Sequence, residues 1–452
     1  MSGRPLVQSA DGHGVERLRL SNLRPSPKYA SFGVVRTVAP KDTIRRVLPM
    51  LEAIGVTRVA DVTGLDRVGI PNFTTVRPRE PGFGISYYNG KGATRSAAKA
   101  GALMEALERH TGERCDLPVY CCTQAEMQRH GPTVDPSQIM EPSVRSYEPD
   151  MLVEWVEGYD LLADVPTFVP LNAVVCPYKP AVGATQLFYS HTNGLASGNT
   201  VEDALCHAIC EVLERDAVAL SDAQQLLAHA VRGLLADAGL GYAAPDSEPV
   251  RAQLVDLDTL PPRSRRLVKM MREAGLLVYI RNLTSTLGIA TFDCLSVERK
   301  LDGRHLVHYG SGTHPDARVA VSRSVTEAAQ SRVAHIQGGR EDLTEIVRTP
   351  APFDPDEVYG AGERISFAAV TSYENANIDD DVRLMLRRLG EIGFRQVVAV
   401  DLTHQELGVP VIRVVMPGAE TWSVFFAHGQ RARLGARANQ VLCDAICGTG
   451  PQ

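Results

Sequence analysis

The chain has 452 residues, of which 44% are hydrophobic and 22% charged, and its formal net charge is −6. This composition is that of a globular protein large enough to bury a sizeable core, and the acidic balance argues against a nucleic-acid partner. The sequence has no apolar run near the roughly 20 residues that cross a bilayer, and no signal-peptide core follows Met1. We therefore expect a cytoplasmic protein with neither a membrane nor a nucleic acid as partner.

The nine cysteines show no pattern typical of disulfides or structural zinc. No CxxC pair occurs, and the closest spacings are one adjacent pair, 121–122, and two pairs four residues apart. We expect most of these cysteines to be small buried hydrophobic residues. A catalytic cysteine stays open as an alternative, although no neighbouring residue marks one.

The first 90 residues predict an arm, one helix and three strands. Residues 1–25 are polar and irregular, which indicates a flexible arm. Apolar residues at helical spacing predict a helix over 43–54 that Gly55 ends. Short apolar runs then predict strands over 56–62, 70–78 and 85–88.

The third strand leads into Gly90-Lys91-Gly92. This turn resembles a phosphate loop only superficially, because the full GxxxxGK[ST] pattern is missing. Lys91 could contact a peptide or a phosphate, or it could simply be a solvated turn residue.

The first of two acidic helices is predicted from Arg95 to His110, with Thr94 as its cap. Its apolar side lies opposite Gly101, Glu105 and Glu108. The second helix covers 198–216, where Gly198-Asn199-Thr200 supplies a turn and a cap. At about 100° per residue, its apolar residues fall on one side, and the other side carries Asp203, His207, Glu211 and Glu214.

Like charges at this helical spacing repel one another, so a cation must lie against these acidic faces. Mg²⁺ prefers oxygen ligands and usually bridges to phosphates, so two helices with inward carboxylates predict a magnesium and phosphate site. The alternative is two exposed acidic faces, or carboxylates that pair with arginines elsewhere. His207 could contact phosphate or metal, or it could be the satisfied neighbour of a carboxylate.

The rest of the chain alternates helices and strands without regular spacing, which favours a mixed α/β or α+β fold over a barrel. We expect a poorly ordered, alanine-rich insertion over 226–246 and a polar turn over 309–316. A helix over 317–336 carries Arg323, and a further site candidate on it is the set Glu327, Gln330 and Arg332. The other predicted elements are helices over 264–274 and 379–391 and strands over 276–281, 288–294, 396–401 and 411–415.

Four motifs in this order resemble those of the YcaO family. They begin at Gly90-Lys91-Gly92 with Ala102 to Arg109, at Gly194 to Asp216, at Gly312 to Arg332, and at Asp401 to Gly418. The resemblance implies a YcaO-type α+β (mixed α/β) fold with sheets packed against helices and a nucleotide site between the acidic helices. The implied organisation is a flexible arm over 1–25, a catalytic domain over 26–420 and a short C-terminal extension over 421–452.

Members of this family use ATP and Mg²⁺ to activate a peptide backbone amide oxygen, and phosphate leaves after a nucleophile attacks. By resemblance, the nucleotide would be bound by Arg36, Thr43, Glu105, Glu108, Asn199, Asp203, Glu211, Glu214 and Arg332. The metal ions would be held by Glu108, Glu202, Asp203, Glu211 and Glu214. Catalysis would depend on Glu214, Arg215 and Arg332, because arginines neutralise developing phosphate charge.

Two positions depart from the family pattern: Gly101 replaces a usual Ser, and Asp203 replaces a usual Glu, so Glu202 beside it stays a candidate. The segments around 88–94 and 102–105 look closest to members that form thioamides with a TfuA-type partner, and the chain ends without the proline-rich tail of many azoline-forming members. The resemblance therefore favours thioamide formation on a precursor peptide or protein, with a sulfide source, a TfuA-like partner and a homodimer. Azoline or amidine formation and a non-catalytic ATP-binding accessory role are the alternatives.

Overall fold

The computed structural model describes residues 18–31, 34–79, 85–238, 252–301, 304–339, 348–349, 355–423 and 433–447. These residues form three sheets, one hairpin and the helices that cover them, so the predicted mixed α/β class is confirmed. No helix within these ranges is both long and apolar enough to cross a membrane.

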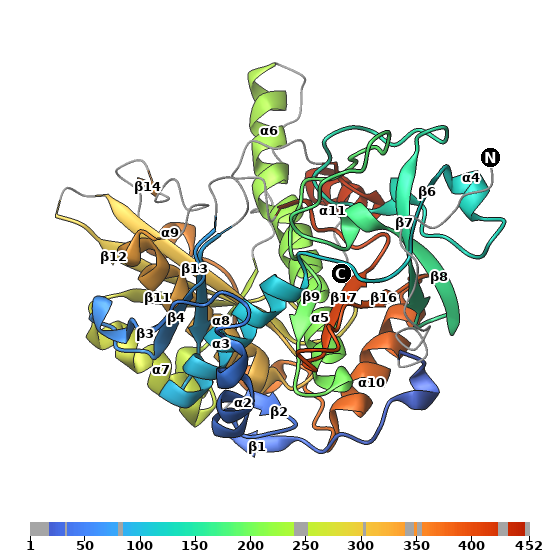
Figure 1. Cartoon of the computed structure of the whole chain (residues 1–452). Coiled ribbons are helices and arrows are strands. Elements are labelled where there is room, and N and C mark those ends of the chain that lie inside the picture. Colours follow the sequence, from blue (N-terminus) through green and yellow to red (C-terminus); the bar gives the residue numbers. More distant parts are fainter. Residues whose placement is uncertain are drawn as a thin grey trace.

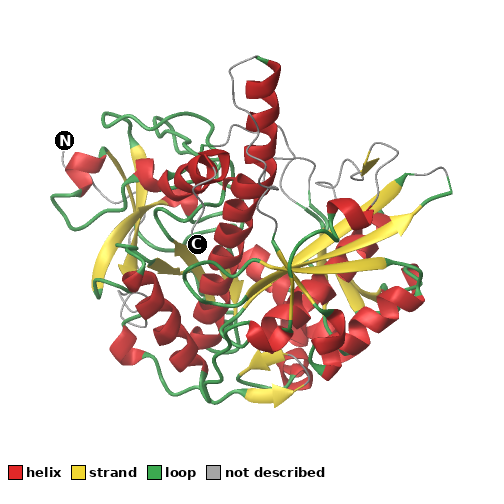
Figure 2. Ribbon diagram, turned by 180° about the vertical axis from the view of Figure 1, so that it is seen from behind, coloured by secondary structure: helices red, strands yellow, loops and turns green. Residues whose placement is uncertain are grey.

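The central element is α5 (Val201–Asp222), which runs between the sheets in Figures 1 and 2. It begins where the sequence predicts, because the Thr200 hydroxyl accepts a hydrogen bond from the backbone N–H of Asp203. Its apolar side packs against α10 (Ile378–Glu391) and β17 (Val411–Val415). The helix therefore has one side in the core and leaves the opposite side for the polar residues.

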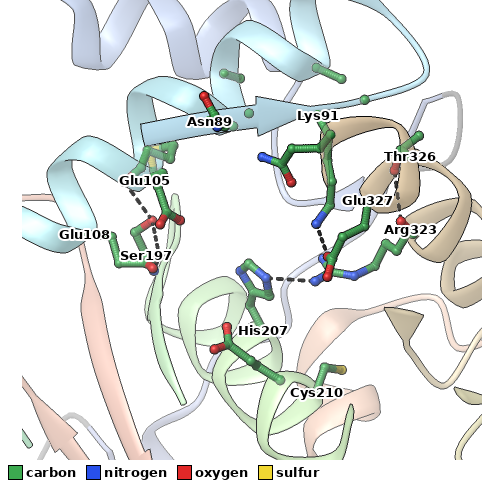
Figure 3. A pocket seen from close by; sticks show the side chains of 18 of the residues that line it. Asn89, Lys91, Glu105, Glu108, Ser197, His207, Cys210, Arg323, Thr326 and Glu327 are labelled. Carbon is green, nitrogen blue, oxygen red and sulfur yellow. Dashed lines mark hydrogen bonds and ion pairs between the residues drawn. The ribbon is translucent and has the colours of Figure 1, made fainter. Parts of the chain in front are cut away.

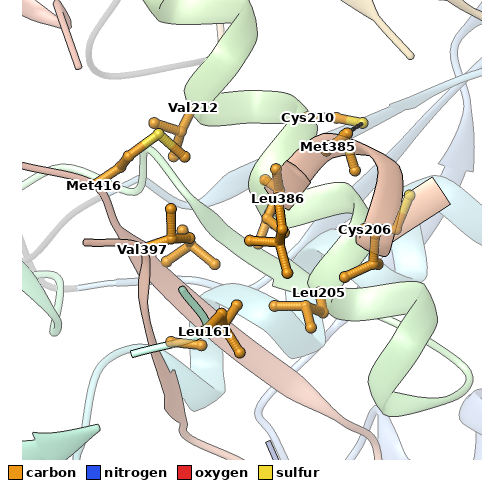
Figure 4. Close-up of a cluster of buried hydrophobic side chains, with 14 of the residues drawn as sticks. Leu161, Leu205, Cys206, Cys210, Val212, Met385, Leu386, Val397 and Met416 are labelled. Carbon is orange, nitrogen blue, oxygen red and sulfur yellow. Dashed lines mark hydrogen bonds between the residues drawn. The ribbon is translucent and has the colours of Figure 1, made fainter. Parts of the chain in front are cut away.

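Figure 4 shows the core beneath α5, where Leu205 and Val212 meet Met385 and Leu386 of α10. The buried Leu18 belongs to the same cluster. The predicted flexible arm is therefore wrong for residues 18–25, and its remainder, residues 1–17, lies outside the described residues.

Two larger sheets lie on either side of α5. The first has the strand order β14-β13-β12-β11-β10-β15 and contains β10 (Gln253–Val255), β11 (Leu277–Asn282), β12 (Thr291–Arg299), β13 (His305–Thr313), β14 (Arg348–Thr349) and β15 (Arg364–Ile365). The second has the order β6-β7-β16-β17-β9, with β8 against β7, and contains β6 (Val119–Cys122), β7 (Val153–Asp160), β8 (Val165–Pro170), β9 (Leu195–Ser197), β16 (Val398–Asp401) and β17.

Helix α8 (Ala317–Gln337) covers β12 and β13 of the first sheet. The helix backbone lies so close that a Cβ atom on Gly310 would fall 2.2 Å from the nitrogen of Ala328. The predicted polar turn over 309–316 is therefore wrong, because most of it is the end of β13. Glycines in this strand allow the close packing of α8, and the low hydrophobicity of the segment gave no sequence signal for a strand.

A third, antiparallel sheet consists of β3 (Arg58–Asp61), β4 (Asn72–Val76) and β5 (Tyr87–Lys91), in that order. Helix α3 (Arg95–Thr111) packs on β5, and the predicted Thr94 cap is confirmed. A hairpin of β1 (Tyr29–Ser31) and β2 (Val34–Arg36) precedes this sheet. Among the described residues, β5 pairs only with β4, so it is an edge strand.

The remaining helices are α2 (Pro40–Val47), α4 (Gln124–Met127), α6 (Ala228–Asp237), α7 (Pro262–Glu273), α9 (Pro355–Val358) and α11 (Ala436–Cys447). The expected poorly ordered insertion is wrong over 228–237, where α6 projects from the body in Figure 1, and it lies outside the described residues from 239 onward. Helix α11 packs against α6, and the neighbouring Trp422 is buried.

Candidate nucleotide and metal site

A cleft of about 1580 Å³ opens where α3, α5, α8 and β5 converge. Figure 3 shows its interior, with β5 above, α5 below and α8 at one side. The charged side chains that line it are the carboxylates of Glu105, Glu108, Asp203, Glu211, Glu214 and Glu327, and the cations of Arg36, Lys91, Arg109, Arg215 and Arg323. The two acidic helices thus face one another across one cavity.

One end of the cleft is acidic. Glu108 is only 6% exposed, and its carboxylate accepts hydrogen bonds from the backbone N–H of Ser197 at 2.7 Å and from the Ser197 hydroxyl at 3.0 Å. Glu214 accepts one from the backbone N–H of Thr313 at 3.0 Å. No residue in the described part of the chain donates a hydrogen bond to Glu211, so this carboxylate is left with its oxygens available.

The pKa values at this end are raised. Burial is the largest cause for Glu108, whose pKa lies well above its usual range, and the charges of Glu105 and Glu211 add to it. Burial also raises the pKa of Glu211 to about 7, against the opposing effect of Arg215. Burial and the charge of Glu327 also raise the pKa of Glu214. Crowded carboxylates with raised pKa values are the arrangement that a bound cation relieves.

The other end of the cleft is basic. His207 lies between two guanidinium groups, with its Nδ1 atom 3.0 Å from Arg36 and its Nε2 atom 3.1 Å from Arg323. Burial, followed by the charges of these two arginines, holds the pKa of His207 well below its usual range, so the ring is neutral. Beside it, Lys91 forms an ion pair with Glu327. His207 therefore neighbours arginines and not the carboxylate that one interpretation of the sequence expected.

The entrance to α5 ties this end to the N-terminal elements. The Asp203 carboxylate accepts hydrogen bonds from the hydroxyl of Thr37 at 2.6 Å and from the backbone N–H of Asn199 at 3.3 Å. The Thr43 hydroxyl donates to the Asn199 side chain at 3.0 Å. The predicted cofactor residues at this entrance lie side by side in the cleft.

Two predicted site residues do not line the cleft. Arg332 belongs to α8, but its side chain is buried outside the cleft. It forms ion pairs with Asp66 at 2.9 Å and Glu298 at 2.9 Å. Glu202 turns away from Asp203 and accepts a hydrogen bond from the backbone N–H of Arg24 at 2.8 Å. Predicted phosphate and metal contacts for these two residues do not fit this geometry, because their side chains already have partners elsewhere.

Arg323 lines the cleft, whereas Arg332, for which we predicted a phosphate contact, does not. Helical geometry explains why: at about 100° per residue, Arg323 lies roughly 40° from Glu327 around the axis, whereas Arg332 lies roughly 140° away. Glu327 and Gln330 both line the cleft. Ser197 and Thr37 were also missed, and no local pattern in the sequence marks either of them.

The described residues fit a magnesium nucleotide. The carboxylates of Glu108, Glu211 and Glu214 are oxygen ligands that a cation would stabilise, because the pKa values of all three stay raised despite the hydrogen bonds to Glu108 and Glu214. Neither Arg36 nor Arg323 forms an ion pair with a carboxylate in the described part of the chain, so both have donors for phosphate oxygens.

Comparisons with known proteins agree with this geometry. A family model described as YcaO cyclodehydratase, ATP- and Mg²⁺-binding, matches residues 89–420. An uncharacterized protein of Methanothermobacter thermautotrophicus is 34% identical over 401 residues, covering 86% of this chain and 96% of that protein. A Rhizobium leguminosarum bv. trifolii protein, described as lying in the tfuA 3′ region, is 29% identical over 444 residues, covering 94% of this chain and 98% of that protein.

The solved structure of YcaO from Methanopyrus kandleri, bound with AMPPCP and Mg²⁺, has 23% sequence identity and a TM-score of 0.66, and covers 91% of this chain and 99% of that one. This likeness confirms the predicted fold. The family model covers well over half of the chain, and the archaeal relative is similar along nearly its whole length. The chain is therefore a member of the YcaO family and binds ATP and Mg²⁺.

Proposed function

We propose that this protein activates a backbone amide of a peptide or protein with ATP, and that the product is a thioamide. The observation that carries the proposal is the division of one cleft into an end with crowded carboxylates and an end where Arg36 and Arg323 have no carboxylate partner among the described residues. Bound Mg²⁺ would neutralise phosphate charge. The acidic end fits metal ions and the basic end fits phosphate oxygens, so the nucleotide spans the two.

Each charged group then has a distinct task. Glu108, Glu211 and Glu214 hold the cation, and the backbone N–H groups at Ser197 and Thr313 fix two of these carboxylates in place. Arg36 and Arg323, which flank His207 at its two ring nitrogens, bind the phosphate groups, and Arg215 adds charge neutralisation. Thr43, Asn199, Asp203 and Glu105 shape the remaining nucleotide contacts.

The nucleophile decides whether the product is a thioamide or an azoline. A relative that matches 94% of this chain is described by its place beside tfuA, which supports a TfuA-like partner and a sulfide as the nucleophile. The description of the family as cyclodehydratases favours azoline formation as the second candidate, in which a Cys, Ser or Thr of the peptide attacks. A homodimer in the cytoplasm, and a catalytic domain that includes residues 18–25, ends at 420 and is followed by an extension over 421–452, complete the proposal.

Mass spectrometry can separate the two reactions. An extract of source cells that lack the gene would be incubated with the protein, ATP, Mg²⁺ and sulfide, and the Glu214→Gln variant would serve as the matched control. A gain of about 16 Da on a peptide means that sulfur replaced oxygen, whereas a loss of about 18 Da at a Cys, Ser or Thr means ring closure. The proposal expects the gain, with ATP consumed. The loss would make the protein a cyclodehydratase, and no mass change would favour an accessory role.

A further inference from the structure

The edge strand β5 forms one wall of the cleft with every one of its residues, Tyr87–Lys91. Its register with β4 pairs Thr75 with Tyr88 and Phe73 with Gly90. The hydrogen bond from the backbone N–H of Arg77 to Ser86 O belongs to the same ladder. Because antiparallel pairs alternate between bonded and non-bonded positions, Tyr88 and Gly90 direct their backbone groups toward β4.

The backbone N–H and C=O groups of Tyr87, Asn89 and Lys91 therefore point away from β4. No described residue forms a hydrogen bond with any of these six groups. The pairing of β4 with β3 is consistent with this alternation. The backbone N–H of Val62 donates to Asn72 O, so Asn72 directs its carbonyl group toward β3, whereas Phe73 and Thr75 direct theirs toward β5. The cleft thus contains a row of backbone donors and acceptors that repeats about every 7 Å.

The flanking helices leave this row open. Helix α3 lies against one face of β5, where a Cβ on Gly90 would fall 2.0 Å from the nitrogen of Ala102, and Lys91 reaches α8 from the other face. A Cβ on Gly101 would lie 3.7 Å from the carbonyl oxygen of Lys91 and 3.8 Å from its nitrogen. Because residue 101 has no side chain, the backbone of Lys91 stays uncovered.

We propose that the free edge of β5 binds the substrate as an extended peptide that adds a strand to the sheet. The inference rests on the proposed function, because it takes a peptide as the substrate. Every second residue of such a peptide would pair with Tyr87, Asn89 or Lys91. The carbonyls of the intervening residues would point away from β5, into the cleft toward α5. The amide that is activated would be one of these, because its oxygen is not bonded to β5.

The position of Lys91 fixes where the target amide lies. Its side chain pairs with Glu327, and Arg323 lies on the same stretch of α8, so the Lys91 end of the edge adjoins the phosphate-binding end of the cleft (Figure 3). A paired peptide therefore runs from the Tyr87 end to the reacting phosphate. Main-chain pairing also tolerates many side chains, so a randomised peptide pool is a suitable probe.

The test measures hydrogen exchange of single backbone amides by NMR in deuterated protein with Mg²⁺ and AMPPCP, with and without a millimolar pool of randomised decapeptides. Exchange at Tyr87, Asn89 and Lys91 should slow by about tenfold or more, whereas Tyr88 and Gly90 should be protected in both samples. A pool methylated at every amide nitrogen should protect nothing. Equal protection by both pools, or no protection by either, would overturn the proposal.

A matched pair of variants removes one edge donor. Asn89→Pro eliminates an N–H that takes no part in the β3-β4-β5 ladder, so the sheet should survive, but the peptide pool should no longer protect Tyr87 and Lys91. Asn89→Ala loses only the side chain and should keep that protection. Protection of these amides without any ATP-dependent mass change would support peptide binding at the β5 edge and contradict the proposed amide activation. A mass change without protection of these amides would contradict peptide binding at the β5 edge and would leave the proposed amide activation intact.

Discussion

The Nε2 atom of His207 lies 3.1 Å from a guanidinium nitrogen of Arg323, and its other ring nitrogen faces Arg36. A neutral imidazole has one N–H and one lone pair, so it can accept a hydrogen bond from only one of the two arginines. The nitrogen of the other guanidinium that faces the ring therefore has a donor opposite it and no acceptor there. A phosphate group supplies the missing acceptors, which makes this arrangement complete only with an anion bound.

Substitution of Arg323 should affect nucleotide binding, whereas substitution of Arg332 should affect the stability of the fold. Arg323→Lys should lower the affinity for Mg²⁺-AMPPCP about tenfold or more, because lysine cannot make a two-pronged contact with phosphate, and should leave the melting temperature unchanged. Arg332→Lys should cost on the order of 2 kcal/mol of stability, because it breaks a buried pairing with Asp66 and Glu298.

Calorimetric titration and thermal unfolding of both variants test this pair. At a temperature where Arg332→Lys is folded, its nucleotide affinity should equal that of the wild type. A large loss of affinity in Arg332→Lys with a normal melting temperature would contradict the placement of Arg332 outside the site.

Glu211 makes stability depend on pH. Its pKa in the folded protein is about 7, above its usual range, so the folded state binds a proton that the unfolded state has released. The contribution of the protonated carboxyl is thus fully present below pH 4.5 and is lost as pH rises through about 7. Without Mg²⁺, stability should fall by on the order of 2 kcal/mol between pH 5 and pH 8.

Melting curves across this pH range, with and without Mg²⁺ and nucleotide, check the Glu211 prediction. Glu211→Gln should make the metal-free pH dependence less steep, while Glu108 and Glu214, whose pKa values are also raised, keep the remainder. Addition of Mg²⁺ and nucleotide should restore the stability of the wild type at pH 8. A metal-free profile that stays equally steep in Glu211→Gln would assign the dependence to another group.

Gly310 and Gly101 form a matched pair for packing. Gly310→Ala should cost about 3 kcal/mol or more, because its Cβ would fall 2.2 Å from the backbone of α8. Gly101→Ala should gain up to about 1 kcal/mol, because the nearest atom lies 3.5 Å away and alanine favours the helix. Chemical denaturation measures both changes. A harmless alanine at 310 would show that α8 and β13 are not in such close contact.

The sequence predicted the helices better than the partners of their side chains. Caps at Thr94 and Thr200 and the 3.6-residue period located α3 and α5, because those signals are local. Strand β13 was missed because its glycines are explained only by α8, which comes later in the chain. Arg332 was expected at the phosphates from the family resemblance, whereas its partners Asp66 and Glu298, which are distant in sequence, hold its side chain outside the cleft.

The central claim is that the acidic end of the cleft binds nucleotide through Mg²⁺. Glu214→Gln keeps an oxygen that can accept the hydrogen bond from Thr313, so the melting temperature should be equal or higher while a metal ligand is lost. Calorimetric titration of AMPPCP into the wild type and this variant, with Mg²⁺ and with EDTA, is the most direct test. We predict binding to the wild type only with Mg²⁺ and strongly reduced binding to the variant. Equal affinity in EDTA, or full affinity in the variant, would contradict the account.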